Sequence, residues 1–183
     1  MKTNIIPRIA AIHDLSGFGR CSLSVIIPTL SAMGMQVCSL PTAVLSTHTG
    51  GFDGYTFVDL TDTMDAYAAH WKSLGISFDC IYSGFLGSQR QIDIILSFID
   101  TFKTENKLVV VDPVFADNGK LYSTIGDDMI AAFKDLCTER DLITPNPTEA
   151  LILLDRDYTQ QVFKKEEIAE IAAELGKKYC DVI

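Results

Sequence analysis

The sequence has no apolar run long enough to cross a membrane. A transmembrane helix needs about 20 consecutive apolar residues, and no segment of the 183-residue chain approaches that length. The first residues also lack the long apolar core of a secretory signal, because their short apolar stretch ends at His13 and Asp14. We therefore expect a soluble protein that does not bind a membrane.

Cysteine is infrequent and widely spaced. The five cysteines are odd in number and form no C-x-x-C pair; they are Cys21, Cys38, Cys80, Cys137 and Cys180. This pattern fits neither a disulfide framework nor a zinc site, and the three histidines are too scattered to propose a metal site. We expect reduced thiols and a cytoplasmic location.

Positive charge is in short supply. Lys and Arg number 15 against 24 Asp and Glu, for a net charge of −9, which argues against nucleic acid as a partner. A nucleotide remains possible where a metal ion and helix N-termini neutralise its phosphates. The sequence also has no Walker loop, no G-x-S-x-G elbow and no H-E-x-x-H motif, which excludes the common P-loop and hydrolase classes.

What the sequence does contain is an alternation of short apolar strands and longer helical segments. Strands are predicted at Arg8–His13, Met35–Leu40, Asp79–Ser83, Leu108–Asp112 and Asp141–Thr144, and a sixth begins at Asp181–Ile183. Helices are predicted to begin near Ser22, Thr61, Ser88, Gly126, Pro147 and Lys165. This order is typical of an α/β fold with a parallel sheet. With 48% hydrophobic residues, residues 1–183 are predicted to form a single domain.

Three local features refine this prediction. Ser88 and Gln91 have the spacing of a capping box, and Pro28 predicts a kink or a late start in the first helix. The last helix, from Lys165 to Tyr179, has an apolar side that the sheet must cover, and the strand after it stops within three residues. From this we expect the natural protein to be longer and the fold to be incomplete at the C-terminus.

The first candidate motif runs from Asp14 to Ser22, between the first strand and the first helix. Doubly wound sheets bind ligands at this position. Its glycines suggest a dinucleotide-binding fingerprint, but Ser22 replaces the third glycine. No acidic residue lies between Asp14 and Asp53, so the residue that would bind the ribose is missing and NAD binding is poorly supported. A strand-to-helix turn that uses glycine for positive φ explains the motif equally well.

The second candidate motif is the polar stretch from Ser46 to Phe52, which includes His48, Thr49 and two glycines. Hydroxyl and imidazole groups suit a small polar ligand, and adjacent glycines suit a closing flap. By itself, the stretch is better explained as an ordinary surface loop.

Two further motifs follow later strands. Asp112 ends a buried strand and could hold Mg²⁺ through water, or it could simply begin a turn before proline. Asn146, with Pro147 and Glu149, forms a well-defined helix cap. The same helix start could bind a metal-associated phosphate, and the two interpretations are compatible.

Together these motifs resemble the ribokinase-like superfamily of small-molecule kinases, in particular its vitamin B6 (pyridoxal and pyridoxamine) kinases. The resemblance rests on Asp14-x-Ser16-Gly17-x-Gly19, Ser46-Thr47-His48-Thr49, Ser83-Gly84-Phe85-Leu86-Gly87-Ser88, Asp112-Pro113-Val114, Asp117-Asn118-Gly119-Lys120-Leu121-Tyr122 and Thr144-Pro145-Asn146-x-x-Glu149. It implies a Rossmann-like three-layer sandwich with a mostly parallel central sheet, and a homodimer.

The resemblance also implies a reaction and a site. ATP would phosphorylate the 5′-hydroxymethyl group of pyridoxal, pyridoxamine or pyridoxine, with Mg²⁺ present. The B6 vitamer would be bound by Asp14, Ser16, Gly19, His48, Thr49 and Phe85. The nucleotide and its phosphates would lie near Asp112, Thr144, Asn146 and Glu149. Of these, Asp112 and Glu149 would face Mg²⁺, most simply through water.

Two departures from the family pattern leave alternatives open. Many B6 kinases have Ser where this sequence has Asp14, whereas hydroxymethylpyrimidine kinases of thiamine synthesis have Asp followed by x-Ser-Gly. In addition, the G-x-G-D motif that carries the family's catalytic Asp is absent, and Thr124-Ile125-Gly126-Asp127 does not replace it. This chain is therefore predicted to contain no catalytic base and to be nearly inactive. A non-catalytic protein that binds a pyridine ligand is the third possibility.

Overall fold

The computed structural model describes residues 6–49, 51–105, 107–122, 125–138, 140–159 and 162–180. The chain divides into two compact units, residues 1–108 and 109–183, each with its own helices and strands. The single domain predicted over residues 1–183 stays a prediction. The strand predicted at residues 181–183 lies outside the described residues.

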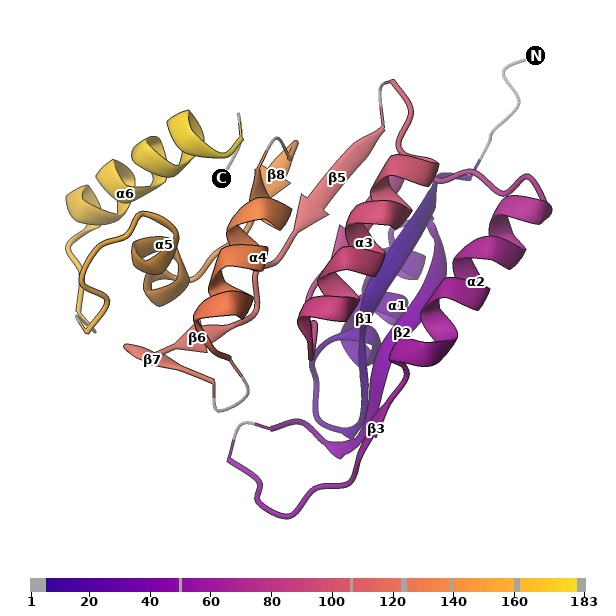
Figure 1. Ribbon diagram of the computed structural model, residues 1–183, viewed down its shortest axis with the longest axis horizontal. Coiled ribbons are helices and arrows are strands. Elements are labelled where there is room, and N and C mark those ends of the chain that lie inside the picture. Colours follow the sequence, from indigo (N-terminus) through magenta and orange to yellow (C-terminus); the bar gives the residue numbers. More distant parts are fainter. Residues whose placement is uncertain are drawn as a thin grey trace. The chain divides into compact units, whose positions relative to one another are not determined.

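The first unit is built on four strands in the order β3-β2-β1-β4, of which Figure 1 labels β1, β2 and β3. The strands are β1 (Arg8–Phe18), β2 (Gln36–Thr47), β3 (Phe57–Asp59) and β4 (Cys80–Ser83). Strand β1 pairs in parallel with β2 and β4, whereas β3 runs antiparallel to β2. The parallel core agrees with the sequence prediction, and the short antiparallel strand β3 was not predicted.

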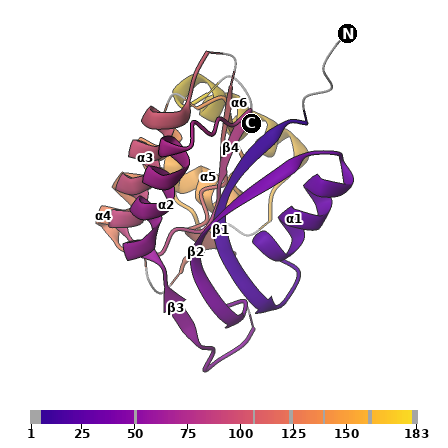
Figure 2. The ribbon, with the colours of Figure 1, turned by 90° about the vertical axis from the view of Figure 1, so that its right-hand side faces the viewer.

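Helices cover both faces of this sheet (Figure 2). Helix α1 (Leu23–Ala32) lies on one face, where Leu23 and Ile26 pack against Ala11 of β1. Helices α2 (Thr61–Ser73) and α3 (Gln89–Phe102) lie on the other face. There, Phe78 contacts Phe98 and Phe102 through ring pairs 5.9 and 5.3 Å apart. This unit therefore has the predicted three layers.

Two predicted helix starts differ in detail from the structure. Pro28 lies inside helix α1, which begins at Leu23, so this helix does not start late. At the start of α3, the Ser88 hydroxyl accepts a hydrogen bond from the Gln91 amide at 3.3 Å. The Gln91 side chain turns to Gly87 instead of Ser88, because its Oε1 accepts from the Gly87 amide at 2.8 Å. Only the Ser88 half of the predicted capping box is present.

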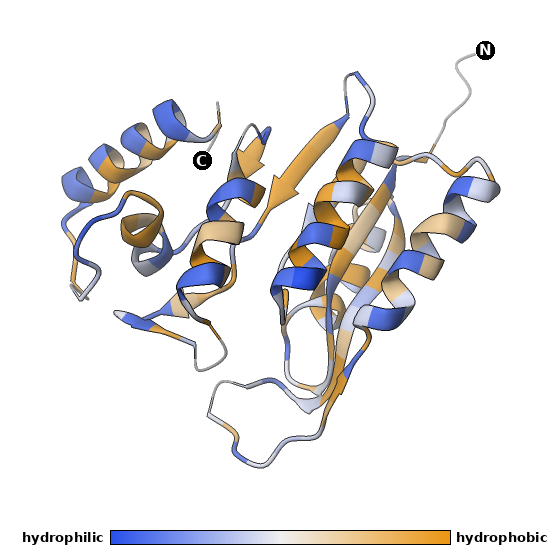
Figure 3. Ribbon diagram, viewed as in Figure 1, coloured by the Kyte–Doolittle hydropathy of each residue, from blue (hydrophilic) through white to orange (hydrophobic). Residues whose placement is uncertain are grey.

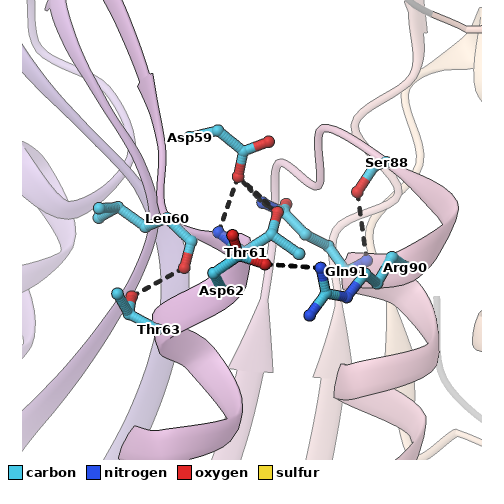
Figure 4. A network of polar contacts seen from close by, with 8 residues as sticks. All are labelled: Asp59, Leu60, Thr61, Asp62, Thr63, Ser88, Arg90 and Gln91. Carbon is cyan, nitrogen blue, oxygen red and sulfur yellow. Dashed lines mark hydrogen bonds and ion pairs between the residues drawn. The ribbon is translucent and has the colours of Figure 1, made fainter.

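The side chain of Gln91 also links α3 to α2 and β2, and Figure 4 draws it beside Thr61 and Asp59. It is buried, and its Nε2 donates to the carbonyl of Thr42 at 3.0 Å and to the hydroxyl of Thr61 at 2.9 Å. Thr61 in turn donates from its amide and its hydroxyl to Asp59. A buried amide with every bond satisfied fixes the relative position of three elements.

Among its described residues, the second unit has two short strand pairs and three helices, which Figure 1 labels. Strands β5 (Leu108–Val111) and β8 (Leu142–Ile143) pair in parallel, and β6 (Ala116–Asp117) pairs antiparallel with β7 (Lys120–Leu121). The helices are α4 (Asp127–Cys137), α5 (Pro147–Leu153) and α6 (Lys165–Lys178). Figure 3 shows β5 and α5 as largely hydrophobic. Helix α5 is buried from Thr148 to Leu153, and β5 buries Val109 and Val111.

Helix α6 buries Ile171 and Leu175. The helix packs against α5, and the expectation that the sheet covers its apolar side stays a prediction. Just beyond the end of α6, the hydroxyl of Tyr179 donates to the carbonyl of Leu153 at 2.7 Å.

Parallel strands occur in both units, so the predicted α/β class with a mostly parallel sheet is confirmed. Within the described residues, no helix has the length and apolar character needed to cross a membrane.

Candidate functional site

Strand β1 carries the first group of predicted site residues. The strand continues to Phe18, five residues beyond its predicted end, and its pairing with β2 shifts between His13 and Leu15. Asp14 lies at this bulge and is buried, with 6% of its surface exposed. The hydroxyl of Ser16, also buried, donates to Asp14 Oδ2 at 3.1 Å. The structure thus brings together two residues that were predicted to bind the B6 vitamer.

The end of β1 also meets the second motif. Gly19 has a φ of +128°, and a Cβ atom there would lie 2.3 Å from Cδ2 of His48. The His48 amide donates a hydrogen bond to the carbonyl of Phe18 at 3.1 Å. The imidazole of His48 stands edge-on to the ring of Phe52, with the ring centroids 5.0 Å apart. Only glycine combines this φ with this close approach. Gly19 and His48, both predicted site residues, are therefore in contact.

Two further predicted residues of the first unit are placed less tightly. Phe85 is half-buried just beyond β4, and its carbonyl accepts a hydrogen bond from the Thr42 hydroxyl at 3.0 Å. Thr49 is exposed shortly after the end of β2. The predicted hydrogen bonds of Thr49 and Asp14 to a pyridine ring stay predictions.

In the second unit, the parallel strands β5 and β8 bring two predicted residues together. Val111 pairs with Ile143, so the residues that follow each strand lie at the same edge. The hydroxyl of Thr144 donates to Asp112 Oδ1 at 3.1 Å. Burial raises the pKa of Asp112, and the hydrogen bond from Thr144 opposes that shift.

The first turn of α5 is held by reciprocal hydrogen bonds. Asn146 Oδ1 accepts from the amides of Thr148 and Glu149, and Glu149 Oε2 accepts from the Asn146 amide at 2.9 Å. This is the predicted capping box. In addition, Asn146 Nδ2 donates to the carbonyl of Ala116 at 2.7 Å, which ties the helix to β6.

Glu149 is almost fully buried, and backbone amides occupy both of its carboxylate oxygens. Its Oε1 accepts from Phe115 at 3.1 Å and from Ala116 at 3.4 Å, and Oε2 accepts from Asn146. Burial raises its pKa to about 8, the amide hydrogen bonds act in the opposite direction, and Asp112 adds to the rise.

These contacts bear on the predicted Mg²⁺ site. Magnesium is usually held by one or two carboxylates together with water and substrate phosphates. Asp112, with one side-chain bond to Thr144, suits that role, whereas both oxygens of Glu149 are already engaged. In the part of the chain that the structure describes, no cluster of three or more His, Cys, Asp or Glu residues could hold a metal ion. The Mg²⁺ site stays a prediction.

Sequence reasoning missed the β6–β7 hairpin beside this helix. Asn118 and Gly119 form its two-residue turn and both have positive φ, +51° and +73°. An Asn-Gly pair between short apolar segments is a strong signal for this turn, and it could have revealed the hairpin. The Gly119 amide donates to the hydroxyl of Thr148 at 3.0 Å, so the hairpin also contacts the first turn of α5.

With this geometry established, comparison with known proteins defines the class. The model of the phosphomethylpyrimidine kinase family matches residues 26–183, and the chain belongs to this family. The resemblance to vitamin B6 kinases of the ribokinase-like superfamily is confirmed.

The solved structures most like this chain include a Bacteroides thetaiotaomicron protein provisionally named a phosphomethylpyrimidine kinase. It is 49% identical with a TM-score of 0.91, over 100% of this chain and 63% of that one. A second crystal form of that protein was solved with pyridoxal. Pyridoxal kinase from Lactobacillus plantarum is 34% identical with a TM-score of 0.84, over 94% of this chain and 60% of that one.

Among curated proteins, a Schizosaccharomyces pombe protein provisionally named a pyridoxal kinase is 29% identical over 154 residues. The match covers 82% of this chain and 49% of the relative. The chain thus spans about half the length, or less, of the curated relatives it matches.

Proposed function

We propose that the protein containing this chain transfers the γ-phosphoryl group of ATP to the 5′-hydroxymethyl group of pyridoxal, pyridoxamine or pyridoxine. The observation that carries this proposal is the 49% identity, over nearly the whole chain, to a protein that was crystallised with pyridoxal. The buried Asp14–Ser16 pair and the Gly19–His48 contact support it, because a pocket for a polar aromatic ring needs a few fixed polar groups beside apolar surface.

Predicted residues of both units have roles in this proposal. Asp14 and Thr49 hydrogen-bond the ring substituents, and His48 and Phe85 line the pocket. In the second unit, Asp112 faces Mg²⁺ near the phosphates, where Thr144 orients its carboxylate. Asn146 contributes to the phosphate environment at the start of α5, and Glu149 holds the β6–β7 hairpin beside it.

The reaction itself needs positioning and charge neutralisation more than covalent chemistry by the protein. The 5′-oxygen forms a bond to the γ-phosphorus while the bond to the oxygen of the leaving ADP breaks. The proton of the hydroxyl passes to a general base. The family's G-x-G-D motif, which supplies that base, is not in this sequence. We expect the 183-residue chain by itself to bind the vitamer with little or no turnover.

A hydroxymethylpyrimidine kinase is the second candidate. The sequence Asp14-x-Ser16-Gly17 favours it, and so does the name of the matching family. Both substrates are planar heteroaromatic alcohols, so one pocket could accept either. The two candidates differ in which substrate reacts faster.

The deciding experiment measures kcat/KM with ATP and Mg²⁺ for pyridoxal and for hydroxymethylpyrimidine, using the protein expressed from its native gene. We expect pyridoxal to be preferred, and a preference for the pyrimidine would favour the second candidate. Asp14→Asn should raise KM for the preferred substrate, whereas Asp65→Asn on the exposed side of α2 should not. Binding of pyridoxal without turnover of either substrate would identify a non-catalytic binding protein.

We also propose that the protein is a cytoplasmic homodimer. Leu15, Val44 and Val58 are paired across β1, β2 and β3, and form a row on one face of the sheet. All three are at least 37% exposed. An apolar row of this kind suits the face of a second copy, and no Asp, Glu, Lys or Arg lies between Arg20 and Asp53 to repel it. Sedimentation of Val44→Asp should show a monomer if this row is the interface.

A further inference from the structure

A glycine beside the proposed vitamer pocket is required for space and not for backbone conformation. Gly84 follows β4, and its amide donates to the carbonyl of Ile12 at 3.0 Å, so the segment stays paired with β1. Its φ is not positive, unlike that of Gly19. A Cβ atom on Gly84, however, would lie 2.1 Å from Nδ1 and 2.5 Å from Cε1 of His13.

The imidazole of His13 fills that space and cannot easily leave it. His13 is 3% exposed, and its ring stands edge-on to Tyr82, with the ring centroids 4.5 Å apart. Burial lowers its pKa to about 3, against an opposing hydrogen bond with the Tyr82 backbone, so the ring is neutral near pH 7. Its Nε2 is buried and has no hydrogen-bond partner among the described residues. Neither a sequence motif nor the proposed reaction accounts for this histidine.

The position of His13 couples two walls of the proposed pocket. His13 immediately precedes Asp14 on β1, and Gly84 immediately precedes Phe85 beyond β4. The backbone of Phe85 is also held by a hydrogen bond, which the Thr42 hydroxyl donates to the Phe85 carbonyl. The thickness of the imidazole therefore sets how closely the chain at Phe85 approaches the chain at Asp14.

We propose that His13 is a positioning residue for the B6 vitamer: seated against Gly84, it fixes the separation of Asp14 and Phe85. This inference rests on the proposed function. It predicts that a methyl group added at Gly84 forces the two walls apart, and that removal of the imidazole restores the space.

The test is a set of variants of the protein expressed from its native gene, with pyridoxal and ADP affinities measured by titration calorimetry and stability measured by thermal melting. Gly84→Ala should weaken pyridoxal binding by about tenfold, which corresponds to about 1.4 kcal/mol, because the added methyl group overpacks the site and shifts a wall of the pocket. The double variant His13→Ala/Gly84→Ala should recover most of that loss. ADP affinity should stay within about twofold of wild type throughout, because the predicted nucleotide residues belong to the second unit.

Gly87→Ala is the matched control on the same loop. A Cβ atom at Gly87 would lie 3.7 Å from the rings of Phe57 and Phe85 and 3.9 Å from Oε1 of Gln91, and all three are ordinary contacts. Pyridoxal affinity should therefore change little.

Three outcomes would overturn the inference. A Gly84→Ala protein that binds pyridoxal as wild type does would show that the contact does not govern the pocket. A double variant no better than Gly84→Ala, or a parallel loss of ADP affinity and melting temperature, would show a general packing role. A wild-type protein that binds ADP but no pyridoxal would instead overturn the proposed function, and this inference with it.

Discussion

Asn146 and Glu149 hold each other in place: Glu149 Oε2 accepts from the Asn146 amide at 2.9 Å, and Asn146 Oδ1 accepts from the Glu149 amide at 3.1 Å. Each side chain also reaches beyond the helix. Asn146 Nδ2 donates to the carbonyl of Ala116, and Glu149 Oε1 accepts from the amide of Phe115. The cap of α5 is thus also the attachment point of the segment that leads into β6.

Asn146→Ala should remove the cap and the bond to Ala116 together. Loss of a helix cap costs about 1 kcal/mol, and an unsatisfied carbonyl adds on the order of 1 kcal/mol. We expect urea unfolding to show a loss of about 2 kcal/mol. Asn146→Asp keeps the cap acceptor and loses only the Nδ2 donor. Its stability should therefore lie between that of wild type and that of Asn146→Ala. Equal losses in both variants would mean that the cap itself contributes little.

The buried carboxyl of Glu149 should make stability fall as pH rises. Its pKa is about 8 in the folded protein, against a usual value of 4.5. Between pH 4.5 and pH 8 the carboxyl is therefore protonated in the folded protein and ionised in the unfolded protein. Ionisation stabilises the unfolded state, so the free energy of unfolding falls as the pH rises. The contribution of Glu149 is fully present below about pH 4.5 and is lost by about pH 8. The slope approaches about 1.4 kcal/mol per pH unit within that window.

Glu149→Gln is the variant that checks this pH dependence. A glutamine resembles the protonated carboxyl, with one acceptor and one donor, but it does not ionise. Urea unfolding of the two proteins from pH 5 to pH 8 should show a smaller decline in the variant. The raised pKa of Asp112 leaves a residual decline of the same sign. If wild type and variant lose stability at the same rate, Glu149 is already ionised across this range.

Gly119→Ala should cost more than Gly75→Ala, although both glycines have similar positive φ, +73° and +65°. A Cβ atom at Gly119 would lie 3.2 Å from the carbonyl oxygen of Thr159, whereas nothing lies within 4 Å of one at Gly75. Gly75→Ala measures the backbone cost alone, about 1 kcal/mol. The difference between the two losses in unfolding free energy is the cost of the contact with Thr159. Equal losses would show that the loop near Thr159 moves aside at no cost.

The pattern of strands and helices was predictable because it follows from hydrophobic periodicity, which is local. The helix start at Pro147 was identified fully, since Asn146 and Glu149 cap the helix through contacts within four residues. The end of β1 was not predicted correctly. Its last five residues include Asp14 and Gly17, which read as a turn, but pairing with β2 extends the strand to Phe18.

Long-range contacts explain what the sequence could not show at the candidate site. The sequence places His13 at the end of an apolar stretch. No neighbouring residue in the sequence indicates that its ring occupies the space where a Cβ atom on Gly84 would lie. Gln91 was read as a capping residue, but its side chain turns to Gly87 and Thr42 instead. In both cases the side chain's partner is set by packing between elements, which periodicity does not encode.

The network around Gln91 offers the sharpest test of such packing. Gln91→Leu keeps the volume but leaves the Gly87 amide without its side-chain acceptor. It also removes one of the two donors to the Thr42 carbonyl, which still accepts from the Leu60 amide. An unsatisfied buried group costs about 1–3 kcal/mol, so we expect a loss of about 1–3 kcal/mol in urea unfolding. Pyridoxal affinity should fall as well, because Thr42 also binds the carbonyl of Phe85.

Arg90→Ala is the control for Gln91→Leu, one residue earlier in the same helix turn. Arg90 pairs with Asp62 at 2.6 Å, but both side chains are largely exposed. Surface ion pairs contribute about 0–1 kcal/mol, so this variant should stay close to wild type and keep its pyridoxal affinity. A loss from Arg90→Ala as large as that from Gln91→Leu would mean that α2 and α3 are held by their surface charges, and that the buried amide only fills space between them.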